Sequence, residues 1–180
     1  MPQPKISIII PTLNEASTIV TCLMGLQGYR SQAEIIVVDG QSSDNTRELA
    51  QPWADQVILS EAGRARQMNA GAASARGDIF LFLHADTRLP EHALTLITTS
   101  MQDQIHWGRF AIELQGQHPA LKVIAFCMHW RSKFTGIATG DQAIFVRRTA
   151  FEHVGKYPDL PLMEDIVLSS KLKKFHRLHA

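Results

Sequence analysis

An imidazole and a carboxylate, His84 and Asp86, follow the strand pattern at 78–83, whose residues 79–83 are all apolar. Residues two apart on a strand point to the same side, so these two side chains can reach one common point. A divalent cation that bridges a diphosphate needs only one or two protein carboxylates, because phosphates and water complete its coordination. The pair therefore predicts a metal site at Asp86, whereas His84 taken alone is also typical of a hydrogen-bonded core histidine.

Asp39 ends a second strand pattern, at 34–39, whose residues 35–38 are apolar, and it is followed by Gly40. A carboxylate at a strand end can accept hydrogen bonds from a nucleobase or a ribose, but Asp-Gly is equally a strong turn signal. Arg64 and Arg66 begin a helical pattern, where a guanidinium suits a phosphate or a base carbonyl and is also common as a solvated helix end. The sequence has no GxGxxG or GxxxxGK[ST] motif, which argues against a dinucleotide site or a P-loop.

Glu164 and Asp165 form a third group of candidates, at the start of the last helical pattern. Acidic residues at a helix start interact favourably with the helix dipole, and capping is a sufficient explanation for the pair. Two adjacent carboxylates also raise each other's proton affinity, which suits a general base.

Alternating strand and helix patterns in the first half of the chain would position these residues. Apolar strands are expected at 6–10, 34–39, 57–60 and 78–83, with helices around 19–26, after Asn45 and at 64–75. Continuous apolar strands separated by helices predict an α/β fold, with a Rossmann-like, mostly parallel sheet covered by helices on both faces. In such sheets ligands bind beyond the carboxyl ends of the strands, so the polar segments 11–15, 39–45, 60–64 and 84–87 should share one rim.

The second half of the chain is expected to form an appended part of the same domain. Its residue patterns predict helices at 89–102 and 119–134 and a last helix from 166. They predict strands at 107–114 and 142–148, and loops at 135–142 and 157–165. The 180 residues are thus expected to form one domain, 1–180, with a nucleotide-binding half at 1–90 and an appended half at 91–180.

Composition narrows the partners and the location. A net charge of +1 gives no argument for a nucleic-acid partner. The distant cysteines, Cys22 and Cys127, offer no disulfide framework, and MPQPKISIII predicts a first strand rather than a signal peptide. A cytoplasmic protein is expected, peripheral to a membrane if the apolar face of the 119–134 helix binds lipid. That face could instead contact the core or a second subunit in a homodimer.

Five segments in order resemble the family 2 glycosyltransferases, which have the GT-A fold: SIIIPTLNEAS, VVDGQSSDNT, GRARQMNAGAASARGDIFLFLHADTRLP, GDQAIFVRR and YPDLPLMED. The wording of HADT, GDQAIFVRR and LPLMED is most similar to a small bacterial subgroup of uncertain substrate, sometimes linked to arsenosugar or lipid-linked pathways.

The resemblance implies transfer of a sugar, with inversion, from a UDP- or GDP-type donor to a hydroxyl of a small-molecule or lipid-linked acceptor. It implies Mg²⁺ or Mn²⁺ on the diphosphate, bound by Asp86, and it implies that Asp165, next to Glu164, is the base. The implied donor-binding residues are Pro11, Thr12, Asn14, Glu15, Asp39, Arg64, Asn69, His84, Ala85 and Asp86, and the implied acceptor-side residues are Gly140, Asp141 and Gln142.

Two departures from the family pattern affect these expectations. His84 stands where the first aspartate of the D-x-D motif usually lies, so Asp86 is expected to dominate metal binding. Relatives often continue beyond the segment matching KKFHRLHA, so the chain is expected to be shortened at its C-terminus, with His176 or His179 as candidate substitutes for a missing ligand. A non-catalytic nucleotide-sugar binder and a sugar-phosphate nucleotidyltransferase remain as alternatives.

Overall fold

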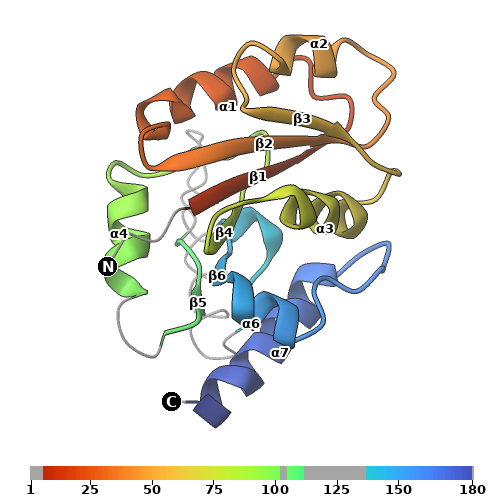
Figure 1. Ribbon diagram of the computed structural model, residues 1–180. Helices are drawn as coiled ribbons and strands as arrows, with labels where there is room; N and C mark the ends of the chain where they lie inside the picture. Colours follow the sequence, from red (N-terminus) through yellow and green to blue (C-terminus); the bar gives the residue numbers. More distant parts are fainter. Residues whose placement is uncertain (1–5, 102–104, 112–136, 180) are drawn as a thin grey trace, which may run out of the picture.

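A six-stranded sheet in the order β3-β2-β1-β4-β6-β5 organises the chain (Figure 1). This computed structural model describes residues 6–101, 105–111 and 137–179. The strands are β1 (Ile6–Thr12), β2 (Ala33–Asp39), β3 (Gln56–Leu59), β4 (Ile79–Phe82), β5 (Trp107–Gly108) and β6 (Phe145–Arg147). The helices are α1 (Ile19–Leu26), α2 (Thr46–Ala50), α3 (Arg64–Ser74), α4 (Ala93–Ser100), α6 (Arg148–His153) and α7 (Glu164–His179), with 3₁₀ turns η1 (Gln27–Tyr29) and η2 (Gly140–Gln142).

The prediction of a mostly parallel sheet is confirmed. Strands β3, β2, β1 and β4 run parallel, whereas β6 pairs antiparallel with β4 and β5 pairs antiparallel with β6. The apolar, β-branched runs of β1 and β2 are buried along nearly their whole length, as expected for strands that are covered on both faces.

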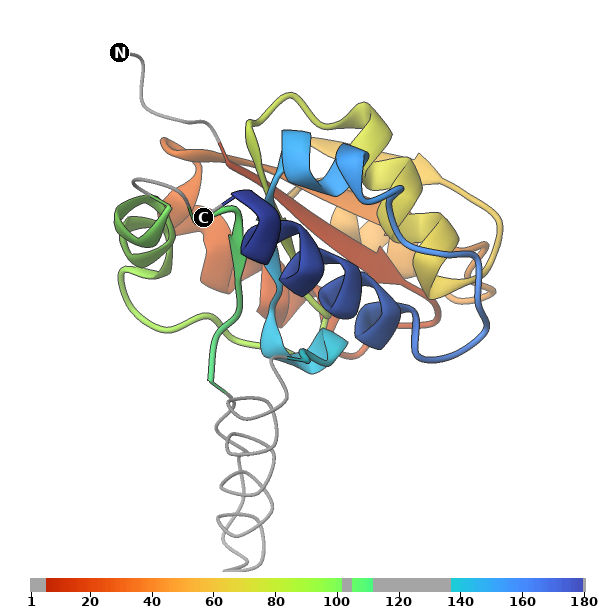
Figure 2. The same ribbon diagram turned by 90° about the horizontal axis from the view of Figure 1, so that it is seen from below.

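Helices cover both faces of the sheet, also as predicted (Figures 1 and 2). One core joins Ile8 and Ile10 of β1 to α1, α2 and α4. The other joins Ile9 of β1 to α3, α6 and α7. Alternate residues of one strand thus serve two separate cores, which follows from the two-residue period of a strand.

Some elements differ from the sequence prediction. The helix expected from residue 89 begins at Ala93, because His92 has a left-handed backbone with a φ of 58°. The strand expected at 107–114 is assigned only at Trp107–Gly108 among the residues that the structure describes there. The short helix α6 was not predicted. The helix expected at 119–134 and Cys127 lie outside the described residues.

Helix α3 lies directly on the sheet because Gly71 has no side chain. A Cβ atom on Gly71 would lie 2.4 Å from Cγ2 of Ile9 and 2.9 Å from Cγ2 of Val38, closer than such atoms approach in folded proteins. The small residues of the 64–75 segment therefore set the distance between the helix and strands β1 and β2.

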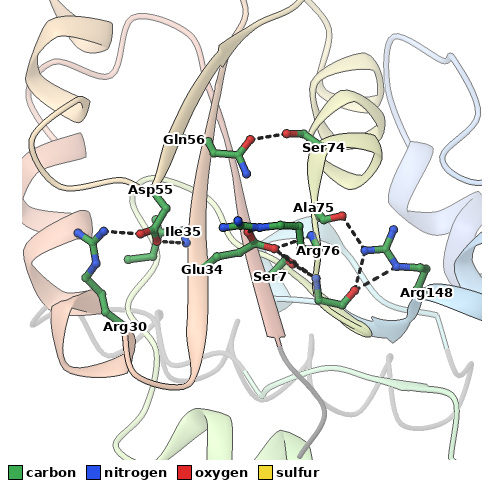
Figure 3. Close-up of polar contacts among 11 residues, drawn as sticks. Ser7, Arg30, Glu34, Ile35, Asp55, Gln56, Ser74, Ala75, Arg76 and Arg148 are labelled. Carbon is green, nitrogen blue, oxygen red and sulfur yellow. Dashed lines mark hydrogen bonds and ion pairs between the residues drawn. The ribbon is translucent and has the colours of Figure 1, made fainter. Parts of the chain in front are cut away.

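Polar side chains fasten the end of the sheet where β1 and β4 begin (Figure 3). The buried carboxylate of Glu34 accepts hydrogen bonds from Ser7 Oγ at 2.6 Å and from the backbone N–H and Nε of Arg76 at 2.6 and 2.9 Å. Arg148 donates to the carbonyls of Ala75 and Gly77 and stacks on the Phe80 ring. This cluster fixes the turn between α3 and β4.

Helices in the described part of the chain are all too short or too polar to cross a bilayer.

Candidate active site

The carboxyl ends of the parallel strands form a polar rim, as the sequence predicts. Thr12 pairs with Asp39 in the ladder, and Asp39 pairs in turn with Leu59 on β3. Beyond the ladder, the Gly40 N–H donates to the Thr12 carbonyl and the Ser60 N–H donates to the Asp39 carbonyl, each at 2.9 Å. Pro11 lies beside Val38 in the same register. Backbone hydrogen bonds between neighbouring chain segments thus continue one residue beyond the strands.

Two rim loops, which follow β1 and β2, are interlocked by side chains. The Oδ1 atom of Asn14 accepts from the backbone N–H and the hydroxyl of Ser43, while the Asn14 N–H donates to Ser42 Oγ. The Glu15 N–H donates to Thr46 Oγ1 at 2.7 Å. Asn14 has a left-handed backbone with a φ of 56°, a conformation that asparagine tolerates better than most residues. Asn14 and Glu15, both predicted to bind the donor, therefore also shape the loop that would do so.

Helix α2 begins at Thr46, directly after Asn45, as the sequence predicts. Asn45 makes no side-chain capping hydrogen bond. Asp44 replaces it: its carboxylate accepts from the backbone N–H and hydroxyl of Thr46, and from the Ala16 N–H at 3.2 Å. The hydroxyl and backbone donors around Asp44, those of Thr46 first, hold its pKa below the usual range. Asp44 thus ties α2 to the loop after β1.

Asp39 lies at the bottom of a small pocket on this rim. Its side chain is buried, with Oδ1 2.5 Å from Ser42 Oγ and Oδ2 3.0 Å from the Ser42 N–H. The pocket has a volume of about 230 Å³. Its lining residues are Asp39, Gln41, Ser42, Asp44, Arg47, Glu48 and Leu59. Ligand pockets usually exceed roughly 300 Å³, so this one has room for part of a nucleotide sugar only.

Gln67 is a rim residue that the sequence analysis missed. It is 4% exposed, and its Nε2 donates to the carbonyls of Thr12 at 2.7 Å and Val38 at 2.8 Å. A Cβ atom on Gly40 would lie only 2.9 Å from its side chain. Gln67 therefore holds the ends of β1 and β2 in place from beneath. The available signal was a polar residue four before Gly71 on the buried face of α3.

His84 and Asp86 follow β4, as predicted, but their environments differ. Asp86 is exposed and accepts a hydrogen bond from Thr87 Oγ1 at 3.2 Å, whereas Ala85 between them is buried. The Nε2 atom of His84 is buried and has no hydrogen-bond partner in the described part of the chain. The two residues are therefore not equivalent candidates for binding a cation.

Several charged side chains lie near His84 and affect its pKa. Burial lowers the pKa of His84 most, and the Arg64 guanidinium lowers it further, while Asp86, Asp141 and Asp165 act in the opposite direction. The net effect keeps the imidazole neutral near pH 7. Four charged side chains from four separate segments thus lie close enough to His84 to affect its titration. The structure brings Arg64, Asp86, Asp141 and Asp165 to one part of the rim.

The start of α7 faces the same region. Glu164 is 3% exposed and Asp165 is 9% exposed. Oδ1 of Asp165 accepts from the Ile166 N–H at 2.8 Å, as expected for a carboxylate at a helix start. The Glu164 carboxylate lies 3.9 Å from Nη1 of the half-exposed Arg64, the first residue of α3. This ion pair links the donor-side helix to the predicted catalytic pair.

The predicted acceptor-side loop is fastened to α7 by Ser169. The buried Ser169 hydroxyl accepts from the Ala138 N–H at 3.0 Å and lies 3.3 Å from the Ala138 carbonyl. The following turn, η2, contains Gly140, Asp141 and Gln142, and Gln142 Oε1 accepts from the Thr139 N–H. Oδ1 of Asp141 is buried and has no hydrogen-bond partner among the described residues. Ser169, which the sequence analysis missed, therefore couples the position of Asp141 to the helix that begins with Glu164 and Asp165.

The side chain of Asn69 makes two hydrogen bonds within the protein. Its amide donates to the Tyr157 carbonyl at 2.9 Å and accepts from the Tyr157 N–H at 3.1 Å. Both of these bonds hold the start of the 157–163 loop against α3. A contact between Asn69 and the donor stays a prediction.

The residues present fit a divalent cation that the donor itself helps to bind. Among the described residues, no three His, Cys, Asp or Glu side chains are grouped as a metal site. Mg²⁺ and Mn²⁺ need only one or two protein carboxylates when phosphates and water supply the rest, and Asp86 is exposed on the rim. The imidazole of His84 suits softer metals better, so Asp86 is the better fit. His176 and His179 belong to α7, but their side chains are not described.

Comparison with known proteins identifies the family. The sequence profile described as Glycosyl transferase family 2 matches residues 7–153. The chain belongs to this family. This chain is 24% identical to the probable glycosyltransferase YdaM of Bacillus subtilis. The alignment covers 94% of this chain and 46% of YdaM.

Solved structures agree on the fold. The family 2 chain matches the mannosyltransferase PcManGT from Pyrobaculum calidifontis, in complex with GDP-Man and Mn²⁺, with a TM-score of 0.73 and 24% identity, over 94% of this chain and 52% of that one. It also matches Mycobacterium tuberculosis glucosyl-3-phosphoglycerate synthase, in complex with Mn²⁺, UDP and glucosyl-3-phosphoglycerate, with a TM-score of 0.70 and 17% identity. This match covers 98% of this chain and 67% of the synthase chain. The predicted GT-A fold is confirmed. The chain spans about half the length of the first two of these relatives.

Proposed function

We propose that this chain transfers a sugar from a nucleotide-diphosphate sugar to an acceptor hydroxyl, in one inverting displacement. The observation that carries the proposal is the group of charges around His84. Arg64, Asp86, Asp141 and Asp165 come from four segments and lie around one imidazole, that of His84, at the rim where ligands of such sheets bind, and the Arg64 guanidinium lies 3.9 Å from the Glu164 carboxylate.

The donor base would bind in the pocket at Asp39. The Asp39 carboxylate can accept from a base N–H, and Leu59, which is 57% exposed, offers an apolar surface for the ring. A donor of UDP or GDP type fits this proposal, since PcManGT was solved with GDP-Man and the synthase with UDP.

The diphosphate would lie toward Asp86 and Arg64. A departing nucleoside diphosphate gains negative charge, and a divalent cation held by Asp86 would neutralise that charge as a Lewis acid. Arg64 begins α3, so its guanidinium and the helix N-terminus would both face the phosphates and stabilise the same charge.

Asp165 would remove the proton of the acceptor hydroxyl. Its carboxylate is held at the head of α7, and a fixed orientation favours proton transfer. Asp141 and Gln142 would contact the acceptor from the segment that Ser169 fastens to α7. With donor and base on opposite sides of the sugar, a single displacement inverts the anomeric carbon.

Thermal unfolding with a panel of UDP- and GDP-sugars, with and without Mn²⁺ or Mg²⁺, tests the donor and metal steps. We expect at least one sugar nucleotide to raise the unfolding temperature, with a larger shift when metal is present, because a ligand of the folded state stabilises it. Asp86→Asn should remove the gain from metal, while His84→Ala should reduce it less. Glu152→Gln, an exposed change on α6, is the matched control.

The opposite ranking, with the metal effect lost in His84→Ala and kept in Asp86→Asn, would reverse the assignment of the metal ligand. Absence of any shift with all sugar nucleotides would contradict donor binding itself.

A further inference from the structure

Four consecutive apolar residues, Leu160–Met163, lie exposed immediately before Glu164. Leu160, Leu162 and Met163 are 41%, 74% and 65% exposed, and Pro161 is exposed as well. Exposed apolar runs of this length are unfavourable unless they serve an interaction. We call these four residues the apolar loop.

Both ends of the apolar loop are anchored. On the N-terminal side, Arg66 Nε donates to both carboxylate oxygens of Asp159, at 2.9 and 3.0 Å, and Asn69 holds both backbone polar groups of Tyr157. On the C-terminal side, the Met163 carbonyl accepts from the Val167 N–H of α7 at 3.1 Å. The apolar side chains are thus presented from a fastened segment.

Backbone conformation at Met163 supports an interaction role. Met163 has a left-handed backbone with a φ of 66°, which is costly for a residue with a long side chain. This conformation leaves Met163 exposed while the next two side chains, Glu164 and Asp165, are buried. Strain of this kind persists where the surrounding structure holds it, and it occurs most often at functional sites.

Only Glu164 therefore separates the apolar loop along the chain from Asp165, the carboxylate that would deprotonate the acceptor. An acceptor whose hydroxyl reaches Asp165 would lie at the start of α7, and its atoms next to that hydroxyl would approach Met163, two residues before Asp165 along the chain. Those atoms would meet methyl, methylene and thioether groups and, from the loop itself, no charge.

We propose that the apolar loop binds an apolar part of the acceptor, an aliphatic or aromatic group close to the reacting hydroxyl. Leu162 and Met163 would be specificity-determining residues, favouring such acceptors over free sugars. This inference rests on the proposed function and narrows its acceptor class.

Two other occupants fit the observations less well. A stable interface with a second copy uses about 20–30 residues on each side, far more than this loop provides. Peripheral membrane binding usually combines an apolar face with basic residues, whereas the arginines beside this loop, Arg64 and Arg66, are paired with Glu164 and Asp159.

Simple alkanols test the inference, because they combine one hydroxyl with an apolar chain of variable length. The full chain is incubated with the sugar nucleotide that stabilises it most, with metal, and with equal concentrations of methanol, ethanol, butanol or hexanol. The ratio of alkyl glycoside to free sugar is measured by mass spectrometry. We expect the ratio to rise by about two- to fourfold per methylene, as burial of a CH₂ group predicts.

The double variant Leu162→Ser/Met163→Ser should flatten this dependence while transfer to methanol and donor stabilisation stay near wild type. Leu96→Ser on α4 and Met24→Ser on α1 are matched controls, since both side chains are also about half exposed. These two variants should keep the wild-type slope.

Two wild-type results would overturn the inference, provided that the donor still binds. One is a ratio of alkyl glycoside to free sugar that does not change with the length of the alkanol, and the other is no transfer to any alkanol. The same holds for a double variant with an unchanged slope. A double variant that instead loses oligomeric mass in light scattering, or loses co-flotation with anionic liposomes, assigns the loop to one of the other occupants. Failure to bind any sugar nucleotide contradicts the proposed function itself.

Discussion

Asp39 and Gln67 both shape the part of the rim where the donor is proposed to bind. Asp39 presents a buried carboxylate to the pocket, and Gln67 fixes the strand ends below it through the carbonyls of Thr12 and Val38. The type and position of Asp39 made it predictable, because an aspartate after a buried strand and before Gly40 is a local pattern. The role of Gln67 depends on partners 55 and 29 residues away, which no local pattern reports.

Asp39→Ala should weaken binding of the nucleoside diphosphate by roughly 5- to 150-fold, since an unpaired buried donor costs about 1–3 kcal/mol. Calorimetry with the diphosphate of the preferred base measures the effect. Ser42→Ala removes the neighbour of Asp39 but leaves the carboxylate, and should cost less. Equal affinities for Asp39→Ala and wild type would exclude Asp39 from base recognition.

Gln67→Leu keeps the size of the side chain but leaves two strand-end carbonyls without their amide donor. We expect the free energy of unfolding to fall by about 1–3 kcal/mol in urea titrations, because buried polar groups lose a hydrogen bond. Gln51→Leu, an exposed glutamine after α2, should change stability little. If Gln67→Leu is as stable as Gln51→Leu, the hydrogen bonds of Gln67 to the two strand ends contribute nothing to stability.

At the scale of elements, apolar runs predicted β1, β2, β3 and β4 and the helices between them to within about two residues. Strand-end polarity then predicted a shared rim. The approach of Asp141 to α7 could not be predicted, because it depends on Ser169, a serine inside an ordinary helical pattern. The left-handed His92 and the antiparallel pairing of β6 likewise follow from tertiary contacts rather than from local sequence.

At the other end of the sheet, the contacts of Glu34 with Ser7 and Arg76 can be tested through their pH dependence. Burial raises its pKa, but hydrogen bonds from Ser7 and Arg76 and the Arg76 charge outweigh burial, so the pKa lies below its usual range. The carboxylate therefore contributes stability above the unfolded-state pKa, about 4.3, and this contribution is lost as pH falls through the lower folded-state pKa.

Glu34→Gln should reduce the free energy of unfolding at pH 7 by about 1–3 kcal/mol, and its difference from wild type should narrow in acid. Glu61→Gln, whose carboxylate is exposed and pairs with Arg66, should have little effect at any pH. A Glu34→Gln deficit that stays constant from pH 7 to pH 3 would show that the charge of Glu34 is not responsible.

On the scale of the whole molecule, the proposed activity depends on segments brought together from the ends of β1, β2 and β4, the start of α3, the η2 turn and the start of α7. The sequence predicted these segments singly, and their order along the chain carried the family resemblance. The match of the family profile to residues 7–153 confirms the family, and the start of α7 lies outside that match. The acceptor could not be identified from the sequence, because its proposed contacts involve side chains such as Leu162, whose exposure depends on the tertiary structure.

The most direct test of the central claim compares wild type and Asp165→Asn in two measurements on the same samples. Sugar release or transfer from the preferred sugar nucleotide measures turnover, and calorimetry measures donor affinity. Asparagine keeps the shape of the side chain but cannot take a proton, so turnover should fall by about 10²–10⁴ while donor affinity stays near wild type. Glu164→Gln should cost less. Full turnover by Asp165→Asn would contradict the assignment of Asp165 as the base.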